Sequence, residues 1–430
     1  MVDSVPNTHG RTAARFCRIV ALTLAALSLA SPAAAQIELI FDSEKAGWAG
    51  SSAADVNASN ANWYYHWWHV TPTEDAQAIG DWVPLVKFSN NWQEKLDLIA
   101  SYENVDTLLV LNEPERENQS NVSVNEAISL WTAVQETLPN HTLVSPGVSD
   151  DPAGRAWLAD FMGQVEARNA NANPNDDLRV DAISIHWYGA STPNNPVGAA
   201  NNFLSRVDFY YQTYDRPIWV TEFAIHDWGG NYSDEAIAEA NRIFLEPVRP
   251  ELESRDYVER YSFYQWFSDA YLFEQGPGPR TPTVTGDAYV GTLQPGDVFD
   301  LAGQSRGNDV VYFRGGTLTN QASAMAQAVR GLDALEGFST IGGAEGWGVA
   351  ALPGTPGEAF ARVRSGATMQ KTGAGRVVFA NATATVDGTL SVAEGTLAMV
   401  GGVLTGAGET RVEAGGVLEL STQRGGDGFL

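Results

Sequence analysis

Eight short apolar segments alternate with helical patterns through the first 290 residues of the chain. Several segments are almost continuously apolar, such as Thr107–Leu111 and Ala182–Ile185, as expected of parallel strands that are buried on both faces. Helical patterns lie at 91–103, 123–137, 153–168, 199–212 and 233–246. The predicted strands span residues 46–49, 62–68, 82–88, 106–112, 142–146, 181–187, 217–222 and 261–267. This order predicts an α/β fold, a (β/α)8 TIM barrel, over residues 36–290.

The composition changes near residue 290. Residues 291–430 hold 28 of the 42 glycines but only one of the 13 tryptophans, Trp347. A motif at Val392–Gly395 recurs at Val412–Gly415, and this 20-residue period is close to one coil of a parallel β-helix. We therefore predict a Gly-rich all-β region, a short parallel β-helix, over 291–430, with a Gly-rich β-sandwich as the alternative. A single helix is predicted to interrupt it at 320–336.

The N-terminal segment has the pattern of an export signal. Three arginines precede an apolar run at 19–30, and the small residues Ala33–Ala35 follow it, which predicts a signal peptide over residues 1–35. The apolar run is shorter than the roughly 20 residues of a membrane span, so we expect a secreted or cell-surface protein without a membrane span. The only cysteine, Cys17, lies within this leader, which excludes a disulfide in the exported product.

The chain is strongly acidic, with 26 basic against 52 acidic residues and a net charge of −26. Such a charge argues against nucleic acid and anionic membrane surfaces as partners. A polyanionic substrate such as pectin or alginate fits poorly for the same reason. A neutral polysaccharide is compatible with this charge, and ordinary solubility alone also explains it.

Two glutamates occupy matching positions in the predicted barrel. Glu113 ends the fourth predicted strand and Glu222 ends the seventh. Buried carboxylates at strand ends are costly unless they are used or paired, and barrel active sites lie at the C-terminal ends of the strands. Two carboxyl groups about 5 to 5.5 Å apart would serve hydrolysis of a glycosidic bond with retention. The pair therefore predicts a glycoside hydrolase.

Other polar and aromatic residues converge on the same rim. The amide of Asn112 can donate to a sugar hydroxyl, and aromatic faces suit the apolar faces of pyranose rings. Alternate aromatic residues of a strand also pack into the core, because successive side chains point to opposite faces. No metal or other cofactor is predicted, since His66 and His69 lack a third ligand. The predicted substrate-binding residues are Asn112, His186, Trp187, Tyr188, Tyr65, Trp67, Trp266 and Tyr264.

Six ordered motifs resemble glycoside hydrolase family 128, the Asl1-like glycosyl hydrolase catalytic domain. The motifs are Trp63–Tyr65, Trp82–Leu85, Leu109–Pro114, Gln119–Ser123 with Trp131, His186–Gly189 and Pro217–Ala224. The resemblance spans residues 45–290 and implies a retaining clan-A barrel that hydrolyses β-1,3-glucan. It also implies that Glu113 is the acid/base and Glu222 the nucleophile. Two departures, Glu115 in place of Asp and His66 in place of Asn, bear on fine specificity.

A second, shorter resemblance lies in the Gly-rich region. Lys371–Gly375 and Glu394–Leu397 are similar to passenger-associated repeats of bacterial autotransporters. Together the observations predict a secreted retaining endo-β-1,3-glucanase that works by double displacement. The alternatives are a retaining β-glycanase acting on another neutral polysaccharide, such as mannan or xylan, and a non-catalytic surface carbohydrate-binding or adhesin protein.

Overall fold

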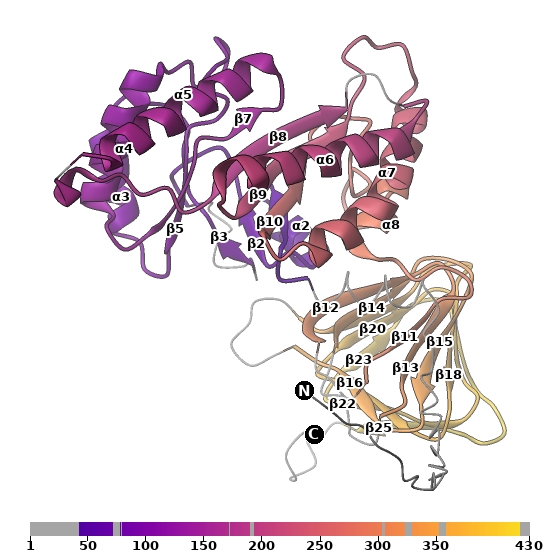
Figure 1. Cartoon of the computed structure of the whole chain (residues 1–430). Helices are drawn as coiled ribbons and strands as arrows, with labels where there is room; N and C mark the ends of the chain where they lie inside the picture. Colours follow the sequence, from indigo (N-terminus) through magenta and orange to yellow (C-terminus); the bar gives the residue numbers. More distant parts are fainter. Residues whose placement is uncertain are drawn as a thin grey trace, which may run out of the picture.

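The structure is a computed structural model that describes residues 43–71, 78, 80–171, 173–189, 193–302, 306–322, 329–351 and 358–421. The predicted signal peptide at 1–35 lies outside the described residues. A strand-and-helix part is followed along the chain by a part built of strands, which lies below the first in Figure 1. Within the described ranges, no helix has both the length and the apolar character of a membrane span.

Parallel strands of the first part close into a barrel. One sheet has the order β3-β2-β1-β10-β9-β8-β7 and a second has the order β4-β5-β6. Pro84 separates β3 from β4 and has no N–H to donate to a neighbouring strand. A parallel bridge between Val144 and Ala182 joins the two sheets. The strands are β1 Ala46–Ala49, β2 Trp63–Tyr65, β3 Asp81–Trp82, β4 Leu85–Val86, β5 Thr107–Val110, β6 Thr142–Val144, β7 Val148–Ser149, β8 Ile183–Gly189, β9 Ile218–Ile225 and β10 Val258–Phe263.

Helices cover this barrel and begin at polar caps. The side chains of Ser123, Asp151, Asn195 and Ser233 each accept a backbone N–H from the first turn of the helix that follows. The helices are α2 Ala53–Ala58, α3 Trp92–Ala100, α4 Val124–Thr137, α5 Pro152–Asn169, α6 Pro196–Tyr214, α7 Asp234–Ser254 and α8 Val284–Val290. The predicted α/β barrel is therefore confirmed, although α7 continues past the predicted end at 246.

The second part is all-β, as predicted, and its strands pair in parallel. Thr368 pairs with Thr389, and Thr389 pairs with Glu409, which matches the period read from the sequence. The predicted helix at 320–336 is wrong over 329–334, where β14 pairs with both β12 and β17; residues 323–328 lie outside the described residues. The strands are β11 Val298–Asp300, β12 Arg306–Phe313, β13 Gly316–Asn320, β14 Val329–Ala334, β15 Phe338–Gly343, β16 Trp347–Val349, β17 Phe360–Val363, β18 Thr368–Thr372, β19 Arg376–Ala380, β20 Thr383–Val386, β21 Thr389–Val392, β22 Gly395–Val400, β23 Val403–Thr405, β24 Glu409–Val412 and β25 Gly416–Ser421.

The two parts are packed together. Val310 and Tyr312 of β12 belong to the same buried apolar cluster as the barrel core. The Tyr312 hydroxyl donates to the carbonyl oxygen of Ala58 at 3.1 Å. Asn60 exchanges two hydrogen bonds with the backbone of Val310, at 2.9 and 3.0 Å. The strand region is therefore joined to the barrel by polar contacts as well as by apolar packing.

A buried lysine stabilises a turn of the strand region. The Nζ of Lys371 donates to the carbonyl oxygens of Thr372, Gly373 and Glu394 at 2.8, 2.6 and 3.0 Å, and burial lowers its pKa to about 8. We expect Lys371→Met to lower the free energy of unfolding by about 2–4 kcal/mol, because buried carbonyl oxygens lose their donor. Thermal unfolding would measure this loss. Gln370→Met, on the same strand, is the control, and equal melting temperatures for the two variants would contradict the assignment.

Candidate active site

The two glutamates differ in their backbone conformation, since Glu113 lies in a turn after a strand and Glu222 lies within a strand. Glu113 follows β5 in a tight segment where Leu111 and Glu113 have φ of +63° and +45°, values that are uncommon for residues other than glycine and that cluster at functional sites. Glu222 lies inside β9 and pairs with His186 of β8, just after a register shift. The prediction that Glu222 ends its strand is therefore wrong, because β9 continues to Ile225.

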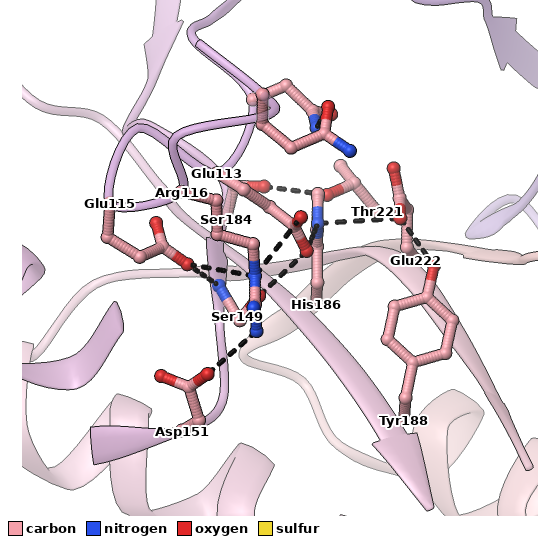
Figure 2. Close-up of polar contacts among 12 residues, drawn as sticks. Glu113, Glu115, Arg116, Ser149, Asp151, Ser184, His186, Tyr188, Thr221 and Glu222 are labelled. Atoms are coloured by element: carbon pink, nitrogen blue, oxygen red, sulfur yellow. Dashed lines mark hydrogen bonds and ion pairs between the residues drawn. The ribbon is translucent and has the colours of Figure 1, made fainter. Parts of the chain in front are cut away.

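His186 lies between the two carboxylates (Figure 2). Its Nδ1 is 3.1 Å from Glu113 Oε1 and 3.5 Å from Glu222 Oε2. One ligand atom from each of the three side chains lies within 4.8 Å of the other two, and all three residues are buried. The two carboxylates therefore lie close enough to act on one glycosidic bond.

Glu113 is held as an anion by surrounding donors. Ser149 Oγ donates to its Oε1 at 2.7 Å, and Arg116 Nε lies 3.4 Å from its Oε2. Burial alone would raise the pKa of Glu113, but the hydrogen bond and charge of His186, with Ser149 and Arg116, outweigh it and lower that pKa to about 2. The pKa of His186 is raised despite burial, by the charge of Glu222 and the hydrogen bond to Glu113. In the enzyme without substrate, a proton between His186 and Glu113 therefore resides on His186.

Glu222 is oriented by aromatic donors. Trp67 Nε1 donates to its Oε1 at 2.9 Å, and the Tyr188 hydroxyl donates to its Oε2. Tyr65 donates to the carbonyl oxygen of Thr221 at 2.9 Å. Burial, followed by the charge of Glu222, raises the pKa of both tyrosines well above the usual value, so both hydroxyls keep their protons. These contacts fix the orientation of the Glu222 carboxylate.

An aromatic rim surrounds the carboxylates. Tyr264 makes edge contacts with Trp67 and Tyr188, with ring centroids 5.8 and 5.6 Å apart. Trp266 makes an edge contact with Trp67 at 6.0 Å, and its indole N–H donates to the carbonyl oxygen of Ala49 at 2.9 Å. Trp266 is 51% exposed, which leaves much of its surface for a sugar ring.

Two predicted residues have other surroundings. Trp187 points away from the carboxylates, because strand neighbours alternate, and it packs against Phe203 and Phe244 at 5.2 and 5.4 Å. Asn112 is buried beside Glu113, with its Nδ2 3.3 Å from Gln119 Oε1. The structure thus brings together Tyr65, Trp67, Asn112, Glu113, His186, Tyr188, Glu222, Tyr264 and Trp266, but not Trp187.

The residues that support Glu113 carry no motif that marks them in the sequence. Arg116 Nε donates to Ser149 Oγ at 2.8 Å, and this hydroxyl in turn donates to Glu113. Ser149 ends β7, so the rule that barrel sites gather at strand ends could have found it. Trp228, 60% exposed beside Tyr188, was also missed, although it is a tryptophan in the loop after β9.

Glu115 and His66, the two departures from the family motif, contact neighbouring residues rather than the two carboxylates themselves. Glu115 Oε1 accepts the backbone N–H of Ser149 at 2.9 Å, and burial raises the pKa of Glu115. His66 is stacked on Trp82 with ring centroids 6.0 Å apart. Both side chains therefore pack against residues that support the rim, rather than against the two carboxylates.

A metal is the other chemistry that the central cluster could serve. In the described part of the chain, Glu113, His186 and Glu222 are the group whose ligand atoms lie close enough to hold an ion. Both carboxylates already accept hydrogen bonds from protein donors, which compete with metal coordination. The expected absence of a metal stays a prediction.

The charge distribution of the cluster predicts a pH-dependent stability. Protonated His186 contributes to the free energy of unfolding. This contribution is complete below the pKa of about 6.5 in the unfolded state and is lost as the pH rises through the higher pKa in the folded state. The Glu113 contribution is complete above about 4.5 and is lost as the pH falls towards about 2. We expect the melting-temperature difference between the wild type and His186→Gln to be largest between these limits and to shrink at alkaline pH. A difference that is constant with pH would contradict the shared proton.

Comparisons with known proteins cover the barrel. A family model described as the glycosyl hydrolase catalytic core matches residues 44–289. Alkali-sensitive linkage protein 1 of Schizosaccharomyces pombe is 23% identical over 243 residues, which are 55% of this chain and 40% of that protein. The chain thus spans less than half the length of this relative.

Similar solved structures cover a little over half of the chain. One is a GH128 subgroup I endo-β-1,3-glucanase from Amycolatopsis mediterranei in complex with laminaritriose. It is 27% identical, covers 58% of this chain and 99% of its own, and has a TM-score of 0.48. Another is a GH128 subgroup III curdlan-specific exo-β-1,3-glucanase from Blastomyces gilchristii. It is 25% identical, covers 57% of this chain and 97% of its own, and has a TM-score of 0.44.

Proposed function

Because this chain belongs to the glycosyl hydrolase catalytic core family, we propose that it is a secreted retaining endo-β-1,3-glucanase. The observation that carries the proposal is the buried pair Glu113 and Glu222, with His186 within 3.5 Å of both. The six ordered motifs that resemble family 128 supply the choice of β-1,3-glucan. The acidic chain and the exposed aromatic rim suit a neutral polymer of this kind.

In the proposed reaction Glu222 attacks the anomeric carbon while Glu113 protonates the departing glycosidic oxygen. Glu113 must therefore receive a proton, and the Nδ1–H of His186, 3.1 Å from Glu113 Oε1, can supply it. Consumption of the negative charge of Glu222 in the glycosyl ester removes the main attraction for that proton on His186. Glu113 then accepts a proton from water, which attacks the ester and releases the sugar with its configuration retained.

The regions outside the site fit an exported enzyme. The leader pattern at 1–35 supports secretion or display at the cell surface. The parallel pairing of β11 to β25, with its repeat near 20 residues, supports a short parallel β-helix after the catalytic barrel. We propose that the exported protein consists of the barrel over 36–290 and the β-helix over 291–430.

A substrate panel tests the proposed function. Purified protein is incubated with laminarin, curdlan, xylan and mannan, and both reducing ends and product lengths are measured. We expect release from the two β-1,3-glucans, with a series of oligosaccharides as early products, and no effect of EDTA on the rate. Glu222→Gln, prepared in parallel, controls for contaminating enzymes. Faster release from xylan or mannan would overturn the substrate, and glucose as the only early product would overturn the endo mode.

A further inference from the structure

A cleft lies between the barrel and the strand region, on residues other than those of the active site. Its volume is about 640 Å³, within the range of roughly 300–1,000 Å³ usual for ligand sites. One wall comes from α2 and from the loop at 276–280, and the other from β12, β14, β17 and β20. In Figure 1 this corresponds to the junction where α2 lies next to β12 and β14.

The strand wall of the cleft is a flat face with side chains in register. Phe360 pairs with Thr383, and Arg362 pairs with Thr385. These four side chains line the cleft, while the residues that alternate with them, such as Ala361, are buried in the core of the strand region. The row of paired residues Phe360 and Thr383 continues across the sheet to Val403, which pairs with Thr383 and is 56% exposed. The face therefore extends beyond the cleft as an open surface.

The aromatic ring of Phe360 lies on the strand wall of the cleft. The ring of Phe360 lies over Gly331, where an added Cβ would come within 2.5 Å of the ring. Glycine is therefore required for the ring to lie against the sheet. The guanidinium of Arg362 is 4.0 Å from the ring centroid of Phe360. The ring thus supports the guanidinium plane of Arg362, and this plane, with Pro277 and Pro279 on the opposite wall, offers surfaces on which a sugar ring can stack.

The cleft is rich in hydrogen-bond donors whose positive charge is largely offset by acidic side chains. Arg280 is paired with Asp55, whereas Asp333 is shared by Arg362 at 3.6 Å and Arg364 at 2.8 Å. Arg330 donates to the backbone carbonyl of Asn57. Glu358 adds a negative charge to the same cleft. Three acids therefore offset most of the charge of the four arginines at 280, 330, 362 and 364. Donors with neutralised charge favour a ligand with many hydroxyl and ether oxygens over a polyanion.

We propose that this cleft is a second binding site for a neutral polysaccharide chain, separate from the catalytic site. The choice of β-1,3-glucan as its ligand rests on the proposed function. The walls are held together by Arg364, which donates to Asp333 Oδ2 at 2.8 Å and to the carbonyl oxygen of Arg280 at 3.1 Å. A glucan chain held there would keep the enzyme on an insoluble polymer while another segment is cleaved.

The test fills the cleft with a bulky side chain at an exposed position. Thr383→Trp is compared with Thr410→Trp, which is exposed on β24 and does not line the cleft. Both are made in the Glu222→Gln background, and the fraction retained on curdlan is measured against protein concentration. We expect about a 10-fold weaker retention for Thr383→Trp alone, which corresponds to 1.4 kcal/mol. Phe360→Ala serves as a second variant, because it removes the ring that supports the Arg362 guanidinium.

The same substitutions in the active enzyme separate binding in the cleft from catalysis. With a short soluble β-1,3-gluco-oligosaccharide, Thr383→Trp should match the wild type in kcat/KM, whereas release from curdlan should fall. Curdlan retention that is unchanged in both Thr383→Trp and Phe360→Ala would overturn the second site. Cleft-dependent binding of polygalacturonate instead of curdlan would overturn its neutral ligand. Absence of β-1,3-glucan hydrolysis by the wild type would refute the proposed function itself, which is a distinct result.

Discussion

Glu222→Gln is expected to lower kcat on β-1,3-glucan by about 10⁴-fold or more, as is usual when a covalent nucleophile is removed. The amide has nearly the shape of the carboxylate and can still accept the indole N–H of Trp67, but it cannot form the glycosyl ester. The measurement is the initial rate of reducing-end release from laminarin. Glu259→Gln is the matched control, since Glu259 is an exposed glutamate of β10 that accepts the indole N–H of Trp219 at 3.0 Å.

Chemical rescue distinguishes a lost nucleophile from a disturbed fold. In Glu222→Ala the space of the side chain is open to a small anion, and added azide should restore turnover of a substrate with a good leaving group. The product should be the α-glycosyl azide, because one displacement replaces two. Residual activity in Glu222→Gln within 10-fold of the wild type would contradict the role of Glu222.

Glu113→Gln is expected to lower the rate by about 10²–10⁴-fold on glucan, the usual contribution of a general acid and base. The loss should depend on the leaving group. A β-laminaribioside of dinitrophenol needs no proton on its leaving oxygen, so its first step should survive and its ester should accumulate as a burst. Ser149→Ala removes only one hydrogen-bond donor to Glu113, and we expect a much smaller loss for this control variant.

The dependence on the leaving group provides the decisive comparison for Glu113. A merely structural role would slow glucan and the activated glycoside by similar factors. Equal losses on both substrates, or the absence of a burst, would therefore contradict the assignment of Glu113 as acid/base.

The barrel was predictable because its strands are short apolar runs, and such runs indicate strands that are buried on both faces. The eight predicted strands and the five predicted helices have counterparts in the structure. The predicted strand at 82–88 corresponds to β3 and β4 together, whereas β7 lies beyond the predicted strand at 142–146. The end of α7 was not predictable in the same way, because Pro247 and Pro250 lie inside the helix and proline usually marks an end. The strand at 329–334 was missed because pairing with two neighbours decided its conformation.

The site was predictable to the level of its two glutamates, but not to the level of its supporting contacts. Tyr188 and Trp187 are adjacent in sequence, and only the direction of the strand decides which of them reaches Glu222. The left-handed backbone at Leu111 and Glu113 has no signal in the residue types. Contacts such as Asn60 with Val310, 250 residues apart, depend on how the two parts pack. The cleft between them was therefore beyond what local patterns could predict.

The stereochemistry of the first product tests the central claim most directly, because it reports whether both carboxylates act in two successive displacements. Laminarin is hydrolysed by the wild-type enzyme in deuterated water, and the anomeric proton signals of the new reducing ends are followed by NMR before mutarotation. We expect the β anomer to appear first and the α anomer to follow only as the sugars equilibrate. Initial formation of the α anomer would show a single displacement and would contradict the roles assigned to Glu113 and Glu222.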